Sequence, residues 1–95
     1  MAAVKERAGQ GPCFLTFDID FVDPAYAPAT GTPEVGGFTA WESQFLVRGL
    51  QGIDFVAFDL VEVSPPYDTR GATTCLLAAN LVYEFISLLA LAGRD

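Results

Sequence analysis

The sequence predicts an α/β fold built from one parallel-sheet βαβα unit. Two short runs rich in apolar, β-branched and aromatic residues, 13–20 and 53–63, each precede a stretch with helical features. The second run is almost continuously apolar, as is typical of a parallel strand covered on both faces. Acidic residues stand near the carboxyl end of both runs. In an open parallel sheet, ligands bind at that edge, so the edge is where we expect function.

The first strand lies between a short helix and a long loop. Residues 2–8 have helical composition and are followed by a glycine. Residues 21–38 contain several prolines and glycines and show neither helical nor strand periodicity. Loops of this length inside a compact domain are usually either functional or disordered. Because this one is apolar and stiffened by proline, we expect it to be ordered and functional.

The two remaining helices follow the loop and the second strand. Thr39 and Glu42 have the spacing of a capping box, and apolar residues recur behind them at helical intervals. Residues 64–71 form a loop with a Pro-Pro pair. Over residues 72–92, Leu, Val, Phe and Ile recur at helical spacing and predict the final helix. Its polar interruptions favour a buried helix over a membrane span.

The composition is unusually apolar for so short a chain. The chain has 95 residues, of which 52% are hydrophobic, and its mean hydropathy is +0.36. A domain of this size buries only about 60% of its unfolded surface. We therefore expect apolar faces that contact partners outside this chain.

The charge balance excludes some classes of partner. Twelve acidic residues against five basic ones give a net charge of −7. Nucleic acids and anionic membrane surfaces require clustered Lys and Arg, so neither is expected as a partner. A metal ion or a cationic substrate suits this charge. The alternative is that most of these charges only maintain solubility.

The cysteines and the first residues of the chain bear on its compartment. Cys13 and Cys75 have no zinc-site spacing and define no disulfide framework. Because both lie in apolar runs, we expect buried free thiols in a reducing compartment. Residues 1–12 are polar and mixed in charge, and show no secretory signal. These features predict a cytoplasmic protein.

A pair of carboxylates follows the first strand. Asp18 and Asp20 are two positions apart, so on a strand they point to the same side. Close carboxylates repel unless they share a proton or bind a cation, and hard ions such as Mg²⁺, Ca²⁺ and Mn²⁺ prefer such oxygens. The alternative is that they cap the following loop. Asp23 precedes a proline, and we expect it to bond loop backbone N–H groups beside the metal ligands. The alternative is that it joins the metal ligands itself.

The second strand supplies a further candidate. Glu62 is an acid in an apolar strand, and a guanidinium group would pair with it through two hydrogen bonds. The alternative is a structural ion pair with Arg48 or Arg70. Asp59 should point to the opposite face and is interpreted as structural. The hydroxyl of Thr32 either binds a polar substrate group or holds the loop in shape.

These residues together resemble a family signature. The segment from Thr16 to Gly37 is similar to the signature of the arginase/agmatinase, or ureohydrolase, family. The resemblance rests on fixed spacing of Asp18-Ile19-Asp20, Asp23-Pro24, Pro28, Gly31-Thr32-Pro33 and Gly36-Gly37. Residues 62–68 resemble the segment typical of the agmatinase branch, and residues 77–81 resemble its final helix.

The resemblance implies a fold and a set of roles. Residues 1–95 would form a single partial domain, the C-terminal part of the three-layer α/β/α arginase-type fold. Asp18 and Asp20 would ligate a pair of Mn²⁺ ions, which make hydroxide available to attack a guanidinium carbon and release urea. Glu62 would hold the guanidinium group, with Thr32 nearby and Asp23 behind the metal ligands. No residue of this chain is assigned a catalytic role beyond such binding.

The departures from the family pattern matter as much. Family members are much longer and use histidines and an Asp-x-His-x-Asp motif as further metal ligands, whereas this sequence has no histidine. The chain is therefore expected to carry part of the site of an agmatinase-like enzyme and to be inactive alone. Full-length relatives are expected to be homo-oligomers. The alternative is a non-catalytic remnant that serves as a metal-binding or oligomerisation module.

Overall fold

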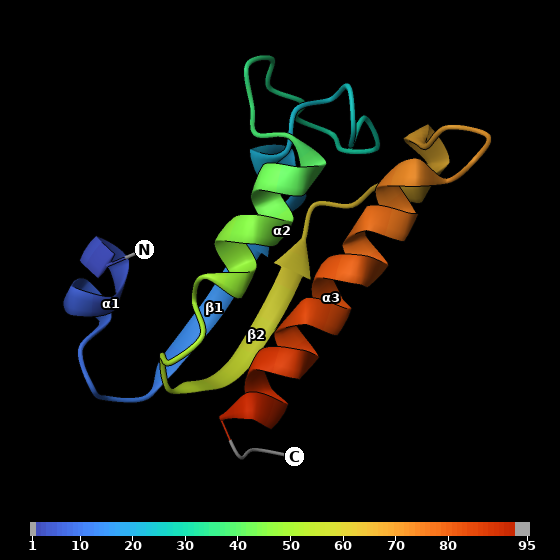
Figure 1. Ribbon diagram of the computed structural model, residues 1–95. Coiled ribbons are helices and arrows are strands. Elements are labelled where there is room, and N and C mark those ends of the chain that lie inside the picture. The colour runs from blue at the N-terminus through green and yellow to red at the C-terminus, as the bar shows by residue number, and fades with distance from the viewer. Residues whose placement is uncertain (1, 93–95) are drawn as a thin grey trace.

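The computed structural model describes residues 2–92 and confirms the βαβα order. Each strand is followed by a short 3₁₀ helix and then by a loop that leads into an α-helix (Figure 1). The elements are α1 (Ala2–Ala8), β1 (Cys13–Asp18), η1 (Ile19–Phe21), α2 (Ala40–Arg48), β2 (Phe55–Val61), η2 (Pro65–Tyr67) and α3 (Thr73–Leu91).

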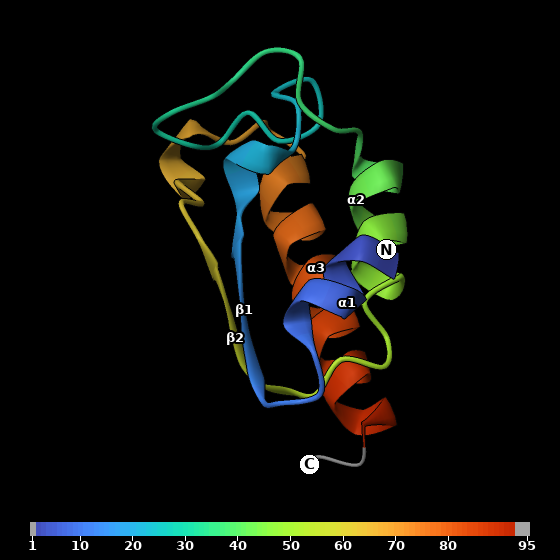
Figure 2. The ribbon, with the colours of Figure 1, turned by 90° about the vertical axis from the view of Figure 1, so that its left-hand side faces the viewer.

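The two strands form a parallel sheet whose carboxyl ends finish level. The register runs from Cys13 opposite Phe55 to Asp18 opposite Val61, with an irregularity after Cys13. Helices α2 and α3 both lie on one side of this sheet, and the loops that follow the strands gather at one end of it (Figure 2). Within the described residues the opposite face is uncovered, and it exposes apolar side chains such as Phe14.

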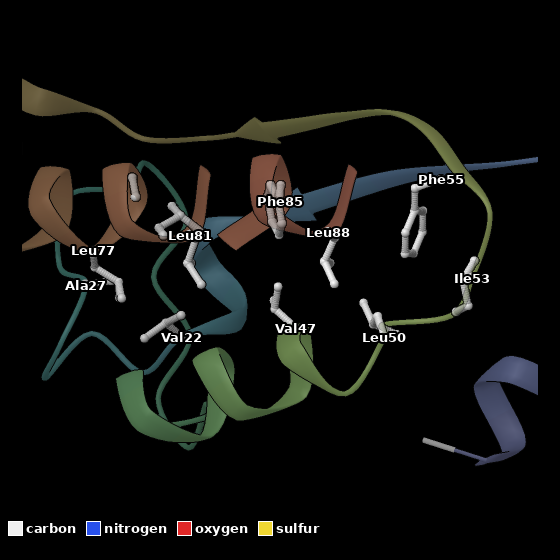
Figure 3. Packing of buried hydrophobic residues seen from close by; sticks show 12 residues of the cluster. Val22, Ala27, Val47, Leu50, Ile53, Phe55, Leu77, Leu81, Phe85 and Leu88 are labelled. Carbon is white, nitrogen blue, oxygen red and sulfur yellow. The ribbon is translucent and has the colours of Figure 1, made fainter. Parts of the chain in front are cut away.

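The core lies between the sheet and the two long helices. Phe85 of α3 is 1% exposed, and its ring lies 6.0 Å from that of Phe17 and 5.1 Å from that of Phe58. Figure 3 shows side chains of α3 placed between the sheet and α2. The helical spacing of these residues explains why one face of α3 is buried. The core comprises Ile19, Val22, Ala27, Val47, Leu50, Ile53, Phe55, Leu77, Ala78, Leu81, Phe85 and Leu88.

The start of α2 confirms the predicted capping box. Thr39 Oγ1 accepts a 3.0 Å hydrogen bond from the Glu42 N–H, and Glu42 Oε1 accepts a 3.0 Å bond from the Thr39 N–H. These bonds satisfy donors that a helix start otherwise leaves free, which is worth about 1 kcal/mol per cap. Further along, Arg48 forms a 2.7 Å ion pair with Glu84 of α3, which ties the two helices together.

Both predicted strands were too long. β1 ends at Asp18 instead of residue 20, because the Asp18 side chain accepts a hydrogen bond from the Asp20 N–H and caps η1. β2 covers Phe55–Val61 instead of residues 53–63, because Ile53 belongs to the turn after α2 and Glu62 adopts a left-handed φ of 71°. In each case the prediction followed the composition of the segment, whereas local backbone geometry ended the strand earlier.

Helix α3 is long and apolar enough to cross a membrane by length and composition alone. One face of it is buried against β2 and α2, which is the placement expected of a core helix. The opposite face exposes large apolar side chains, including Leu76 and Ile86. The surplus of apolar residues seen in the sequence is thus displayed on the surface of this chain.

The prediction for the cysteines was half right. Cys13 and Cys75 are both free, but each is only partly buried. Cys13 lies at the open amino-terminal end of β1, and Cys75 lies in the first turn of α3, where packing from other elements is incomplete. A hydrogen bond to the Asp68 carboxylate raises the pKa of the Cys75 thiol.

Candidate metal and substrate site

Asp18 and Asp20 are brought together by a turn and not by strand alternation. Asp18 is the last residue of β1, and Asp20 lies inside η1. The Asp20 N–H donates a 3.1 Å hydrogen bond to Asp18 Oδ1. The same-side argument for two residues on one strand is therefore wrong here, although the turn still places both carboxylates at the carboxyl end of the sheet. The loop-capping alternative also holds for Asp18, which caps η1.

The acidic surroundings raise the pKa of Asp18. Partial burial is the main cause, and hydrogen bonding between its side chain and that of Asp20 adds to it. The negative charges of Asp20 and Glu62 raise the pKa further, while the backbone N–H of Asp20 acts in the opposite direction. Two further carboxylates thus act on Asp18, which is the electrostatic setting in which a cation is stabilising.

Thr32 lies next to the metal-ligand candidates. Its hydroxyl donates a 2.9 Å hydrogen bond to Asp20 Oδ2. Thr32 and Asp20 are twelve residues apart in the chain, so this bond folds the middle of the long loop back over the end of β1. In this structure the hydroxyl of Thr32 therefore orients a carboxylate. Its predicted contact with substrate stays a prediction.

Asp23 closes the ends of the long loop. Its carboxylate accepts hydrogen bonds from the Ala25 N–H at 2.8 Å and the Gly36 N–H at 3.0 Å. The bond from Ala25 is the main reason that the pKa of Asp23 is lowered, and the bonds from Gly36 and Gly37 add to it against the effect of burial. Gly37 must be glycine, because a Cβ there would lie 2.8 Å from the Asp23 nitrogen. These bonds hold the two ends of the loop together.

Glu62 stands just beyond the end of β2. Its φ of 71° is a left-handed conformation that costs about 1–2 kcal/mol for a non-glycine residue. Such outliers are concentrated at functional sites. The proposed pairing of Glu62 with Arg48 is wrong, because α2 packs on α3 and places Arg48 against Glu84. That is the only ion pair within residues 2–92, so none involves Glu62 or Arg70.

Asp59 is separated from this cluster. It lies on β2, where its Oδ1 accepts a hydrogen bond from the Thr16 hydroxyl of β1. Thr16 alternates along β1 with side chains that pack against the core, so the bond crosses the uncovered face of the sheet. The structural interpretation of Asp59 agrees with this contact.

The donor set fits a divalent cation but does not complete its coordination. Within residues 2–92, no group of three or more His, Cys, Asp or Glu side chains could hold a metal ion. Asp18 Oδ1 accepts a bond from the Asp20 N–H, and Asp20 Oδ2 accepts one from the Thr32 hydroxyl. Two hard oxygen ligands at one edge suit Mn²⁺, and the remaining ligands would have to come from outside this chain.

The fold and the acidic edge agree with comparisons to known proteins. The profile of the Arginase family matches residues 1–87. The chain therefore belongs to the arginase family. A guanidinobutyrase of Pseudomonas aeruginosa is 57% identical over 89 residues, which are 94% of this chain and 28% of the relative.

Two solved structures show which members of the family the fold of this chain resembles. A hypothetical agmatinase from Burkholderia thailandensis superposes with a TM-score of 0.89 and 39% identity over 97% of this chain and 29% of that one. The proclavaminate amidino hydrolase of Streptomyces clavuligerus superposes with a TM-score of 0.91 and 42% identity, over 96% of this chain and 30% of that one. Within the family, the chain belongs to the agmatinase-like branch. It spans less than a third of these relatives, in agreement with the predicted C-terminal portion of the arginase-type fold.

Sequence reasoning missed the residues that anchor the start of α3. Asp68 accepts backbone hydrogen bonds from Thr69, Thr74 and Cys75 at 2.8, 3.1 and 2.9 Å. Although burial opposes it, these bonds and one from the Cys75 side chain hold the pKa of Asp68 well below its usual value. An acid shortly before a helix is a recognisable capping signal. The hydroxyl of Thr74, by contrast, gives no such local signal, because its partner is distant in the chain.

Proposed function

We propose that this chain carries part of the active site of a Mn²⁺-dependent enzyme that hydrolyses an agmatine-like guanidino compound to an amine and urea. Membership of the arginase family supports guanidino hydrolysis in general. The observation that carries the proposal to individual residues is geometric: Asp18 ends β1 opposite Val61, Asp20 follows in η1 bonded to Thr32, and Glu62 comes directly after Val61 at the same end of the sheet.

The roles follow from the chemistry of these side chains. Asp18 and Asp20 would bind Mn²⁺ through carboxylate oxygens, and Thr32 holds Asp20 in orientation through their hydrogen bond. When bound, a pair of such ions supplies hydroxide near neutral pH. Glu62 would bind the guanidinium group through two charge-assisted hydrogen bonds. Asp23 stabilises the loop that presents Thr32.

The chain alone is proposed to be inactive, because two carboxylates are too few ligands for a binuclear site. On addition of Mn²⁺ at millimolar concentration, we expect no urea from agmatine or guanidinobutyrate. Urea release that is lost in Asp20→Asn would overturn this part of the proposal.

A chimera tests the site directly. In the P. aeruginosa guanidinobutyrase, the segment aligned with this chain is replaced by the corresponding 89 residues. We expect Mn²⁺-dependent urea release that Asp20→Asn abolishes and that Glu62→Gln weakens mainly through KM. Asp59→Asn is the matched control, since Asp59 lies on the other face of the sheet. A folded, active chimera that tolerates Asp20→Asn would contradict the proposal.

A second candidate is favoured by the exposed apolar surface. Phe14, Trp41, Phe45 and Leu76 are each more than half exposed. A non-catalytic remnant could use such faces for oligomerisation while retaining the metal ligands. If the chimera binds Mn²⁺ yet never hydrolyses a guanidino compound, this candidate is preferred. We further propose that the chain acts in the cytoplasm with a small cationic substrate, and that the full-length form is a homo-oligomer.

A further inference from the structure

One residue, Ala29, links the two walls of the proposed site through its backbone N–H and its carbonyl oxygen. Ala29, which is fully buried, lies in the loop between η1 and α2. Its N–H donates a 3.1 Å hydrogen bond to Thr74 Oγ1, and its carbonyl oxygen accepts a 2.7 Å bond from the Ser64 N–H. Ser64 follows Glu62 by two residues, and Ala29 precedes Thr32 by three. The segments that carry Thr32 and Glu62 are thus joined at Ala29.

This link begins where the sheet stops holding the chain together. The β1–β2 ladder ends with Asp18 opposite Val61, so no strand pairing constrains the residues beyond. Among the described residues, the bond from Ser64 to Ala29 is the only backbone hydrogen bond between the two loops that follow the strands. The sheet therefore holds Val61 opposite Asp18, and the conformation of Glu62 beyond it depends in addition on the contacts of the following loop.

Thr74 provides the fixed end of the link. It is 0% exposed, and it occupies the first turn of α3. Its own N–H donates to Asp68, whose carboxylate also binds the N–H groups of Thr69 and Cys75. Helix α3 packs on the sheet and α2 over most of its length. The Thr74 hydroxyl is thus held in place by the most extensively packed element of the molecule.

We propose that Thr74 is a positioning residue that, through the backbone of Ala29, fixes Glu62 relative to Asp18 and Asp20. The inference rests on the proposed function for the roles of those three carboxylates. Removing the Thr74 hydroxyl leaves the Ala29 N–H buried without an acceptor, which is strongly unfavourable. The loop then shifts to reach water, and the bond from Ala29 to Ser64 weakens with it. Glu62 loses its fixed position while the packing of α3 is retained.

The test uses the full 95-residue chain, labelled with ¹⁵N, and substoichiometric Mn²⁺ as a paramagnetic probe. The ratio of relaxation enhancements at the Glu62 and Asp20 amides reports how far each amide lies from the bound ion. This ratio does not depend on the fraction of chains that hold the metal. We expect Thr74→Val to change this ratio by about twofold or more and Thr74→Ser to restore it, as an orienting hydroxyl requires. An unchanged ratio in a folded Thr74→Val chain would overturn the proposal.

A matched control separates positioning from general stability. Ser43 is also 0% exposed and lies in the first turn of α2, where its hydroxyl donates to the Thr39 carbonyl at 2.8 Å. Ser43→Ala should lower stability and leave the Glu62 to Asp20 ratio unchanged. An equal change of the ratio in Ser43→Ala would show that any buried hydroxyl has this effect, which would refute a specific role for Thr74.

Amide hydrogen exchange in the metal-free chain decides the proposal independently of metal binding. The Ala29 and Ser64 amides should be protected about tenfold or more relative to the exposed Gly31 amide, because both are bonded inside the structure. Exchange at the Gly31 rate would overturn the proposal even if Thr74→Val fails to fold. If Mn²⁺ causes no relaxation near Asp18 in the native chain, the metal proposal fails, and the exchange result alone decides the role of Thr74.

Discussion

Thr32 Oγ1 donates a 2.9 Å hydrogen bond to Asp20 Oδ2. The bond joins the middle of the long loop to the metal-ligand candidate at the end of β1. Asp18, in turn, accepts a 3.1 Å bond from the Asp20 N–H through Oδ1. A hydrogen bond to a ligating carboxylate fixes its orientation and thereby strengthens metal binding. The hydroxyl of Thr32 is thus part of how the loop prepares the site for a cation.

Replacing Thr32 by valine should weaken Mn²⁺ binding by about tenfold, the lower end of the range for residues that orient metal ligands. Thr32→Ser retains the hydroxyl and should bind Mn²⁺ almost as the native chain does. Isothermal titration or the electron paramagnetic resonance signal of free Mn²⁺ gives both constants. Equal affinity in the valine and serine variants would show that the hydrogen bond does not support the metal site.

Removing both carboxylates should abolish divalent binding. The double variant Asp18→Asn with Asp20→Asn keeps the size of both side chains and removes their charges. We expect weak Mn²⁺ binding by the native chain and none by the double variant. Asp59→Asn is the control, because it removes one carboxylate that faces Thr16 on the uncovered side of the sheet. The metal site would be elsewhere if the double variant titrated like the native chain.

The left-handed backbone at Glu62 predicts a stabilising substitution. Glu62→Gly relieves a conformational cost of about 1–2 kcal/mol in the folded chain. It also makes the unfolded chain more flexible, which lowers stability by about 0.5–1 kcal/mol relative to alanine. We expect the glycine variant to be about 0.5–1 kcal/mol more stable than Glu62→Ala by urea denaturation. Both variants lack the carboxylate, so the comparison isolates the backbone. If Glu62→Ala were the more stable variant, the backbone at residue 62 would not be strained.

The helix anchor at Asp68 predicts a defined dependence on pH. The pKa of Asp68 is lowered in the folded chain, so its contribution to stability is present above its unfolded pKa of about 3.9 and is lost as pH falls below that value. Asp68→Asn should therefore lower the melting temperature at pH 7. The difference from the native chain should shrink steadily below about pH 4. A difference that is constant between pH 7 and pH 2 would exclude the charged hydrogen bonds as its cause.

The exposed apolar side chains predict self-association of the isolated chain. Phe14 is 57% exposed and Val56 is 47% exposed, and both lie on β-strands whose outer face is uncovered within the described residues. Light scattering should show species larger than a monomer at micromolar concentration. The double variant Phe14→Ser with Val56→Thr should shift the distribution towards monomer, because exposed apolar patches drive association. A monomeric native chain would show that these exposed apolar side chains do not drive self-association.

The sequence by itself determined the order of the elements, the capping box at Thr39 and the acids at the strand ends. Those features depend on periodicity and on contacts between residues three or four positions apart, which a single segment contains. It also determined the family, because the spacing from Asp18 to Gly37 is a local pattern.

Only the tertiary structure decided the partners of particular side chains. Arg48 binds Glu84, 36 residues away, and the Ala29 N–H binds Thr74, 45 residues away. The sequence left Arg48 as a candidate partner for Glu62 and gave Thr74 no role. Such pairs form only when α3 packs against the sheet and α2. That packing is decided by burial of the whole core and not by any single segment. The composition of a segment carries no signal for a partner that only the packed chain brings near.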